Sequence, residues 1–279
     1  MNEEGNRRRE ESLRVFSHAA SIYDRIGPAI FSHFGQRLVD AAGIAAGANV
    51  LDVAAGRGAL LFAAAAEVGP TGHVTGIDFS PDMVRETVKD IESQKLPHVE
   101  ICQMDAERMD FADASFDQIL CGFAMWMFAE PARVLQKFYR VLRLGGRVAL
   151  STWAADNPSQ TWCQEVLRPF VFAPGAKDFP AKIDVKFDTA SQIETALQQA
   201  GFNDIRITGE EKDFVYTSEE QYWLSLWSAG LRRQLEKIAS AALEQAKSDV
   251  SRKLQEFKKP DGFHQVDRAL FAFGTKTGQ

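Results

Sequence analysis

The segment that decides the fold is Val50-Leu-Asp-Val-Ala-Ala-Gly-Arg-Gly58. Its first four residues form a short apolar run typical of a buried strand, and Gly56 and Gly58 follow where the chain must turn. The alanine-rich stretch from Ala59 to Val68 then favours a helix. The sequence therefore predicts a strand, a turn whose backbone a ligand can approach closely, and a helix.

Similar units follow along the chain. Apolar runs predict further strands, and amphipathic spacing predicts the helices between them. The expected strands are 73–78, 99–104, 116–121, 147–153, 204–208 and 268–273, and the expected helices are one that begins at Ser80 and those at 132–142, 191–200 and 231–257. Alternating strands and helices imply parallel pairing with right-handed crossovers. The predicted fold is α/β and Rossmann-like, with a seven-stranded, mostly parallel sheet flanked by helices.

The flanking segments have different patterns. Leu13 to Ala42 has helical spacing broken at Gly27-Pro28, which predicts an N-terminal helical cap of two helices. From Asp156 to Asp188, prolines and aromatic residues interrupt the regular pattern after the fifth strand, which predicts an insertion. We expect a cap at 1–45, a cofactor-binding core at 46–155, a substrate-side insertion at 156–190, and the rest of the core with a helical lid or subunit contact at 191–279.

Composition limits the classes of function. The 279 residues are 45% hydrophobic and 25% charged, as in folded enzymes, and the net charge of -6 argues against a nucleic-acid partner. The sequence has no apolar run of the roughly 20 residues that a membrane span needs, so stable membrane insertion is not expected. Three scattered cysteines lack zinc or redox spacing, so we expect no metal site and a cytoplasmic location.

Asp78 makes the glycine turn more specific. It ends the next predicted strand about 20 residues further on, where a carboxylate can accept hydrogen bonds from both hydroxyls of a ribose. The turn lacks the third glycine of the dinucleotide fingerprint, and no Gly-Lys-Ser/Thr ending supplies a phosphate cradle. These features favour a nucleoside without phosphates.

With these residues in place, the chain resembles class I S-adenosylmethionine-dependent methyltransferases, and among them the ubiquinone/menaquinone-biosynthesis type and its small-molecule relatives. The resemblance covers about residues 23–153. The matching segments, in order, are Val50–Gly58, Gly76–Met83, Met104–Glu107, Phe116–Phe123 and Leu142–Val148. The resemblance implies S-adenosyl-L-methionine as cofactor and S-adenosyl-L-homocysteine as product.

The resemblance also implies roles for single residues. The backbone of Ala54, Gly56 and Gly58 would approach the methionine part of the cofactor. Asp78 would bind the ribose, and Phe123 would lie beside the methionine part and the transferred methyl group. The adenine would be contacted on its faces by Phe79 and Met83, and at its edge by Asp105 and the backbone of Ala106.

Two residues near the turn leave alternatives open. Arg57 stands where relatives often carry threonine, so it either contacts the cofactor carboxylate or points into solvent or pairs with acids of the protein itself. Asp52 lies inside the strand, where an isolated charge is costly. We expect it to bond loop amides or, through water, the cofactor's ammonium group. The alternative for Asp52 is a purely structural carboxylate.

Methyl transfer from a sulfonium needs alignment and exclusion of water, and a catalytic base is optional. Candidates for a base are Tyr23, His18 and His33 in the cap. Tyr23 is favoured because it matches a Tyr-Asp pair in relatives, where the tyrosine often closes over the cofactor. For His18 and His33 the alternative is a surface or capping role.

Aromatic residues gather after the fourth and fifth strands and in the insertion: Phe123, Trp126, Phe128, Trp153, Trp162, Phe170, Phe172 and Phe179. Ligands of open α/β sheets bind at the carboxyl ends of the strands, so these residues predict an apolar pocket for an aromatic, polyketide or isoprenoid-like acceptor. Ordinary core packing is the alternative for each of them.

The predicted function is transfer of a methyl group from S-adenosylmethionine to carbon, oxygen or nitrogen of a small hydrophobic acceptor, as in secondary metabolism or quinone-like biosynthesis. A homo-oligomer is compatible with this function. The alternatives are a methyltransferase of tRNA or protein, and a non-catalytic subunit that binds the cofactor.

Overall fold

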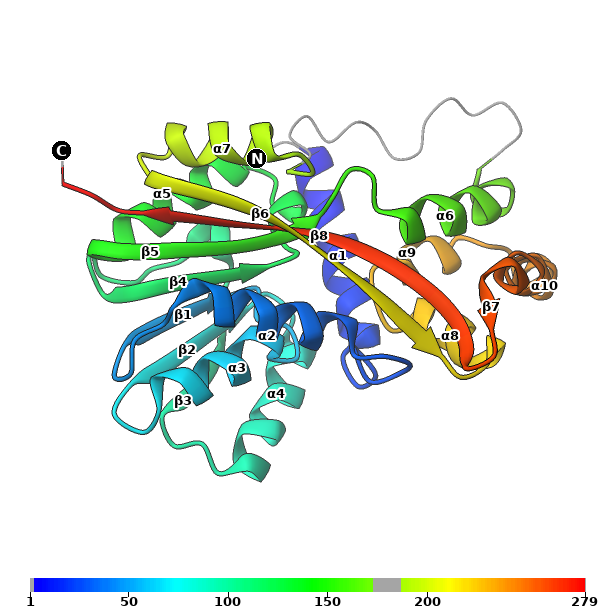
Figure 1. Ribbon diagram of the computed structural model, residues 1–279, viewed down its shortest axis with the longest axis horizontal. Coiled ribbons are helices and arrows are strands. Elements are labelled where there is room, and N and C mark those ends of the chain that lie inside the picture. Colours follow the sequence, from blue (N-terminus) through cyan, green and yellow to red (C-terminus); the bar gives the residue numbers. More distant parts are fainter. Residues whose placement is uncertain (1–2, 173–186, 279) are drawn as a thin grey trace.

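A central sheet organises the computed structural model, which describes residues 3–172 and 187–278 (Figure 1). The strands lie in the order β3-β2-β1-β4-β5-β8-β6, and the two-residue strand β7 pairs with β8. Their bounds are β1 Asn49–Val53, β2 His73–Asp78, β3 Val99–Gln103, β4 Phe116–Gly122, β5 Leu142–Trp153, β6 Asn203–Tyr216, β7 Lys258–Lys259 and β8 Gly262–Thr275.

The five strands from β1 to β5 pair in parallel, while β8 runs antiparallel between β5 and β6. This confirms the predicted seven-stranded, mostly parallel sheet with flanking helices. Both β6 and β8 are longer than predicted, because they pair with each other from Asn203↔Thr275 to Tyr216↔Phe263.

Helices cover both faces of the sheet. Their bounds are α1 Glu3–Ala19, α2 Ile30–Ala42, α3 Ala59–Val68, α4 Pro81–Gln94, α5 Pro131–Val141, α6 Pro158–Val171, α7 Ala190–Gln199, α8 Glu219–Trp227, α9 Arg232–Leu235 and α10 Ser240–Leu254. Residues of α2 and α3 share one buried core with β1 and β2, and residues of α5 and α7 share another with β4 and β5 (Figure 1). The first of these cores lies beneath the glycine turn. No helix in the described part of the chain is both long and apolar enough to cross a membrane.

The start of α4 shows how local sequence sets an element. The Ser80 side chain accepts a hydrogen bond from the Met83 amide at 3.3 Å, and Pro81 occupies the first turn, where its missing N–H costs nothing. The signals of an N-cap followed by proline therefore place the helix directly after β2. This fixes the position of Asp78 relative to the glycine turn.

A third core lies beyond the sheet, where the far ends of β6 and β8 extend to meet α6, α8, α9 and α10 (Figure 1). Trp162 stacks on Tyr222 with ring centroids 5.5 Å apart and lies 5.3 Å from the Phe257 ring. These rings connect the helical elements to one another, and Tyr222 connects them to β6 through an edge-to-face contact with Tyr216 at 4.9 Å.

Two helical segments also differ from the prediction. The irregular segment expected after β5 contains the helix α6, because Pro158 lies in its first turn, where proline is tolerated. The long helix predicted over 231–257 is instead α9 and α10, followed by the 3₁₀ turn Gln255–Phe257. Leu235, Ile238 and Ala246 keep helical spacing through the break and all enter the third core, so the periodicity concealed it.

Candidate cofactor and acceptor site

The glycine turn takes the backbone conformation that its sequence predicts. Gly56 and Gly58 have φ of 54° and 82°, and a Cβ atom built on Gly58 would lie 2.5 Å from the Phe62 ring. A Cβ on Gly56 would meet no atom within 4 Å among the described residues. Ala54 also has a positive φ, 57°, a conformation strained for an L-residue and frequent at functional sites.

Asp78 connects β2 to this turn. Its Oδ2 accepts a hydrogen bond from the Gly56 amide and its Oδ1 accepts one from the Ser80 amide, each at 2.8 Å. The Thr87 hydroxyl donates to the Gly56 carbonyl oxygen at 2.8 Å, which fixes the turn from α4. Desolvation in this enclosed position raises the pKa of Asp78, although the backbone hydrogen bonds oppose the rise.

A cavity of about 260 Å³ lies between the cap, the glycine turn and the ends of β4 and β5. Four of the predicted site residues, Tyr23, Ala54, Gly56 and Phe123, line it. The Ser151 hydroxyl, in β5, belongs to the same wall and is buried with no hydrogen-bond partner among the described residues. The cavity therefore joins residues far apart in the sequence at the edge where this class of sheet binds ligands.

Aromatic rings form one side of the cavity. Tyr23 stacks on Phe31 with ring centroids 5.0 Å apart, and Phe31 meets Phe123 edge-to-face at 5.5 Å. Trp153 lies behind Phe123, with a ring separation of 4.2 Å. Phe123 has φ of 52°, so both the residue after β1 and the residue after β4 are conformationally strained where they enter this wall.

The three candidate bases differ in position. Tyr23 lies in the cavity wall, and burial together with the charges of Asp24 and Asp78 raises the pKa of its phenol. His18 lies at the surface, where its Nδ1 is 3.2 Å from Glu236. His33 packs between the rings of Phe34 and Phe214, and burial lowers its pKa. Of the three, Tyr23 is the one that the structure brings to the cavity.

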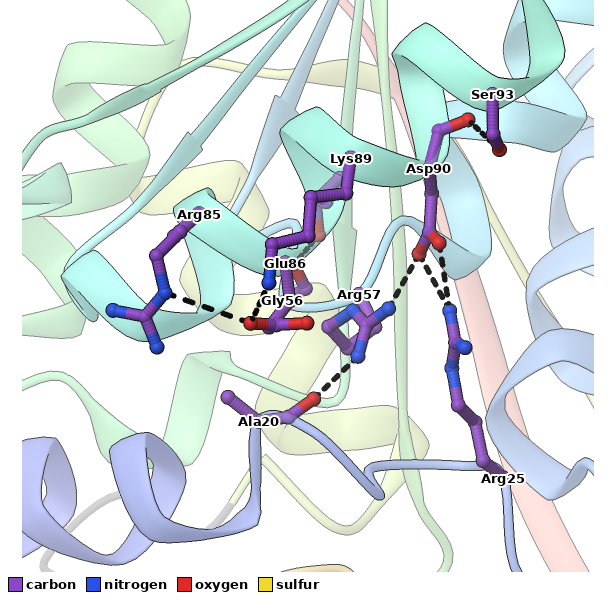
Figure 2. Close-up of polar contacts among 10 residues, drawn as sticks. Ala20, Arg25, Gly56, Arg57, Arg85, Glu86, Lys89, Asp90 and Ser93 are labelled. Carbon is purple, nitrogen blue, oxygen red and sulfur yellow. Dashed lines mark hydrogen bonds and ion pairs between the residues drawn. The ribbon is translucent and has the colours of Figure 1, made fainter.

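Arg57 pairs with an acid of the protein itself (Figure 2). Its Nη2 lies 2.5 Å from Asp90 in α4, and its Nη1 donates to the Ala20 carbonyl oxygen in the cap. Arg25 of the cap donates from Nη2 to both Asp90 oxygens, at 2.8 and 2.7 Å. All three charged side chains line the cavity, so this ion-pair cluster connects the cap, the glycine turn and α4.

Asp52 is completely buried in β1, opposite Gly76 of β2. Neither of its carboxylate oxygens has a hydrogen-bond partner of normal geometry in the described part of the chain, so the expected bonds to loop amides are not observed. Burial and the charge of Asp78 raise its pKa well above the usual range.

The residues predicted to contact adenine lie under the cap helix α1. Arg9 of α1 places its guanidinium 4.2 Å from the centre of the Phe79 ring, and its Nη2 is 2.6 Å from Asp105. Met83 and Ala106 are buried nearby in the fold, with 1% and 6% of their surfaces exposed. The helix α1 thus covers this part of the predicted site, while the cavity opens beside the glycine turn.

Most of the other predicted pocket aromatics pack elsewhere. Phe128 packs against the core of α5 and α7, and Trp162 and Phe170 pack in the third core. Trp126 lies in the 3₁₀ turn after β4, with its indole nitrogen buried. Phe179 lies outside the described residues. Core packing, the alternative considered for each of these aromatics, holds for Phe128, Trp162 and Phe170.

Several cavity residues received no role from the sequence, among them Arg25, Phe31, Asp90 and Ser151. Arg25 follows the Tyr-Asp pair directly, and this proximity was a usable signal. Asp90 is one of several acids on an amphipathic helix, and Ser151 is one residue of an apolar strand. Their positions become special only when α4 and β5 pack around the turn.

Comparison with known proteins shows the family. Residues 44–205 match the family model described as a methyltransferase domain. Aklanonic acid methyltransferase DauC of Streptomyces sp. (strain C5) is 35% identical over 52% of this chain and 66% of its own length. Nocamycin O-methyltransferase of Saccharothrix syringae is 31% identical over 78% of this chain and 81% of its own length. Demethylmenaquinone methyltransferase of Listeria welshimeri is 29% identical over 71% of this chain and 89% of its own length.

Solved structures show the same fold at low sequence identity. The YcgJ protein from Bacillus subtilis aligns with a TM-score of 0.60 at 19% identity, over 88% of this chain and all of that one. Phosphoethanolamine N-methyltransferase 2 of Haemonchus contortus, with S-adenosylhomocysteine bound, aligns with a TM-score of 0.57 at 19% identity, over 88% of this chain and 53% of that one.

The described residues fit S-adenosylmethionine in three respects. The turn at Gly56 leaves open space for close approach, Asp78 presents a carboxylate beside it, and the cavity carries the buried, unpartnered Nε of Arg57. Together with the match over residues 44–205, these features identify the chain as a member of the methyltransferase-domain family that uses S-adenosylmethionine as its methyl donor.

Proposed function

We propose that this enzyme methylates a small hydrophobic acceptor that binds against the aromatic wall of Tyr23, Phe31 and Phe123. The observation that carries the proposal is the position of this wall, at the ends of β4 and β5 and beside the glycine turn. Apolar walls with a few polar groups are typical of small-molecule sites, and Ser151 supplies one such group here.

Apart from Asp52, which is completely buried in β1 and for which we propose the structural alternative, the cofactor assignments from the sequence enter this proposal unchanged. Ala54, Gly56 and Gly58 receive the methionine part, and Asp78 receives the ribose. Phe123 lies beside the methyl group, and Tyr23 closes over it. Phe79, Met83, Asp105 and Ala106 receive the adenine after α1 has moved. Support comes from the cavity, which contains the methionine-side residues, and from the hydrogen bonds of Asp78 to the turn.

The bound cofactor supplies an activated methyl group on a sulfonium. The residues of this chain then have two tasks, which are to align the acceptor and to exclude water. The stacked rings of Tyr23 and Phe31 cover the cavity from the cap side. The backbone at Phe123 is fixed by a hydrogen bond from its amide to the Ser151 carbonyl oxygen at 2.8 Å. This rigidity holds the wall beside the reacting groups.

The geometry favours an acceptor that needs no strong base. The raised pKa of Tyr23 keeps the phenol protonated near neutral pH, and His18 is held at the surface by Glu236. Tyr23 is therefore suited to donate a hydrogen bond or to shape the pocket. An acceptor whose nucleophilic atom is ionised or otherwise reactive at neutral pH satisfies these conditions, and a base role for His18 would need rearrangement of the cap.

The curated relatives support a small acceptor. Their names refer to aklanonic acid, nocamycin and demethylmenaquinone. We transfer from them the class of small, largely apolar molecules of secondary metabolism or quinone biosynthesis. These names give no support to methylation of tRNA or protein, or to a non-catalytic role. We also propose a cytoplasmic enzyme without nucleic-acid partners, in which residues 191–279 complete the core with a helical lid. Part of the predicted acceptor-side insertion, residues 173–186, lies outside the described residues.

The test is incubation of the purified full chain with methyl-labelled S-adenosylmethionine and a panel of hydroxylated naphthoquinones, polyketide-like aromatic acids, small amines and tRNA. The proposal predicts label in an aromatic or quinone acceptor, and labelling of tRNA alone would contradict it. The variant Phe31→Ala removes one ring of the wall and is expected to raise KM for such acceptors about two- to tenfold, because an aromatic contact contributes about 0.5–1.5 kcal/mol. Size-exclusion chromatography of the same sample tests whether the chain forms a homo-oligomer.

A further inference from the structure

We infer that the Ser151 hydroxyl binds an oxygen atom on the ring of the acceptor, and so favours an oxygenated aromatic or quinoid ring over a purely hydrocarbon one. The inference rests on the proposed function, because it concerns the acceptor that binds against the aromatic wall. It adds to that function a polar contact and the kind of ring that this contact recognises.

The Ser151 side chain lies on the cavity face of β5. Side chains alternate between the two faces of a strand, so Ser151 shares its face with Ala149 and Trp153, which both pack in the core of α2 and α3. Ser151 also borders a second cavity of about 10 Å³, but its neighbours Leu150 and Thr152 line that one from the opposite face. The hydroxyl therefore belongs to the cavity of about 260 Å³ beside the glycine turn.

This hydroxyl is buried without a hydrogen-bond partner. Ser151 is 1% exposed, and its Oγ has no partner in the part of the chain that the structure describes. Another hydroxyl of the cavity lining, that of Ser32, donates to Asp24 at 2.6 Å. A buried polar group left unpaired costs free energy, and an oxygen atom bound in the cavity supplies the partner that Ser151 lacks.

The position of the hydroxyl relates it to the reacting groups. Ser151 is the partner of Gly122 in the pairing of β4 with β5, and a Cβ atom built on Gly122 would lie 3.5 Å from the Ser151 Oγ. Phe123 follows Gly122 and donates its amide hydrogen to the Ser151 carbonyl oxygen at 2.8 Å. Because Gly122 has no side chain and lines the cavity, a ligand can reach the hydroxyl at the level of Phe123.

The surroundings of the hydroxyl determine which ligand group fits. Apolar side chains that line the same cavity include Phe31, Leu60 and Phe123. A serine hydroxyl donates one hydrogen bond and can accept others, so a carbonyl or hydroxyl oxygen on a ring held by the wall satisfies it. A hydrocarbon ring leaves it unpaired, and sites with a buried polar group discriminate against ligands that cannot bond to it.

The experiment compares two ring compounds of similar shape, 2-naphthol and 2-methylnaphthalene, in which a hydroxyl takes the place of a methyl group. Each is titrated by fluorescence into the full chain saturated with S-adenosylhomocysteine. The proteins are the wild type, Ser151→Ala and Thr152→Val. Thr152→Val is the matched control, because it removes a hydroxyl from the next residue of β5, on the opposite face.

The quantity compared is the dissociation constant of 2-methylnaphthalene divided by that of 2-naphthol. The two compounds also differ in hydrophobicity, but this difference is common to all three proteins. Ser151→Ala is expected to lower the ratio about three- to tenfold, as the loss of one neutral hydrogen bond predicts, and Thr152→Val should leave it unchanged. Both variants should keep the wild-type affinity for S-adenosylhomocysteine.

Stability provides a second measurement that separates binding from a structural role. Without ligand, the midpoint of urea unfolding of Ser151→Ala should equal that of the wild type or exceed it, because the variant removes a buried hydroxyl that has no partner. A serine needed only for folding would lower the midpoint. A lower ratio together with a lower midpoint would therefore overturn the inference.

The inference is also overturned if Ser151→Ala keeps the wild-type ratio, the result expected when the hydroxyl binds only water. Weaker binding of S-adenosylhomocysteine with an unchanged ratio would assign the hydroxyl to the cofactor and reject the acceptor contact. Failure of the proposed function looks different, because then neither naphthalene compound binds the wild type saturated with S-adenosylhomocysteine. That result would reject the acceptor wall and the serine contact with it.

Discussion

The two halves of the predicted cofactor site differ in how far the cap covers them. On the methionine side, the cap loop and the glycine turn border a cavity of about 260 Å³. On the adenosine side, α1 lies over the site, with Arg9 against both Phe79 and Asp105. Both halves are built from loops after parallel strands, so the difference comes from the cap.

This difference implies an order of events. The contacts of α1 with the core include the ion pair of Arg9 with Asp105 and a hydrogen bond between the Ser17 and Ser80 hydroxyls at 2.9 Å. On its other side α1 pairs with the third core, through Glu11 to Lys237 at 2.9 Å. Arg14 and His18 of α1 also pair with Glu236. Because exposed ion pairs contribute little each, we expect α1 to be able to move while the methionine side keeps its shape.

The largest effect is expected for Asp78→Ala, which removes a side chain that bonds both the glycine turn and the start of α4. The variant loses the hydrogen bonds to Gly56 and Ser80 and the acceptor for the ribose. Charge-assisted bonds of this kind contribute about 1.5–3 kcal/mol each, so affinity for S-adenosylhomocysteine is expected to fall at least about 100-fold in calorimetry. Asp82→Ala, four residues later, is the control, and unchanged affinity of Asp78→Ala contradicts the ribose assignment.

The glycine turn gives the next effect, and its two glycines predict different outcomes. Gly58→Ala forces a Cβ to within 2.5 Å of Phe62 at φ of 82°, so it is expected to lower the free energy of unfolding by about 1–3 kcal/mol. Gly56→Ala meets open space and bears only the strain of its positive φ, so it is expected to destabilise less but to weaken cofactor binding. Denaturant unfolding of both variants measures the difference. Equal losses of unfolding free energy in the two variants would reject the distinction between the two glycines.

A smaller effect on the adenosine side is expected for Arg9→Ala. Removing the guanidinium takes away the contacts with Phe79 and Asp105 that keep α1 in place, so S-adenosylmethionine should associate about three- to tenfold faster in stopped-flow fluorescence. Arg14→Ala, which removes an α1 ion pair to Glu236 away from the adenine residues, is the comparison. Slower association or weaker binding of Arg9→Ala would show that Arg9 holds the adenine instead of covering its site.

No effect on cofactor affinity is expected for Asp52→Asn, but a pH-dependent effect on stability is. Burial raises the pKa of Asp52 in the folded protein. The contribution of this residue to stability is therefore full when the pH is below the ordinary pKa of aspartate, and it is lost as the pH rises through the pKa of Asp52 in the folded protein. The advantage of the variant in unfolding free energy should therefore grow between pH 4 and pH 8. An advantage that shrinks over this range would contradict the buried, unpaired state.

The parts of the fold that depend on local signals were predictable. Alternating apolar runs and glycine breaks predict β1 to β5 and their helices, and the Ser80-Pro81 signal predicts the start of α4. The break between α9 and α10 was not predictable, because Leu235 and Ile238 continue the helical spacing across it. The helix α6 was missed although Asn157 and Pro158 give the same start signal, because Pro169 lies inside the helix, where proline is normally unfavourable.

The site residues also fall into two groups, those that local motifs predict and those that depend on packing. The turn residues and Tyr23 were found from motifs, because their roles depend on backbone shape and local order. Asp90 and Ser151 depend on packing between distant elements, which no spacing in the sequence records. For Arg57 the sequence left two readings, and the structure shows pairing with Asp90 together with an unsatisfied donor.

The most direct test is a crystal structure of the full chain with S-adenosylhomocysteine. It should show the amino-acid end in the cavity beside Gly56 and Arg57, the ribose on Asp78, and the adenine against Phe79 with Arg9 displaced. The predicted cofactor site would be contradicted by product bound elsewhere, or by adenine bound while Arg9 stays in contact with Phe79 and Asp105.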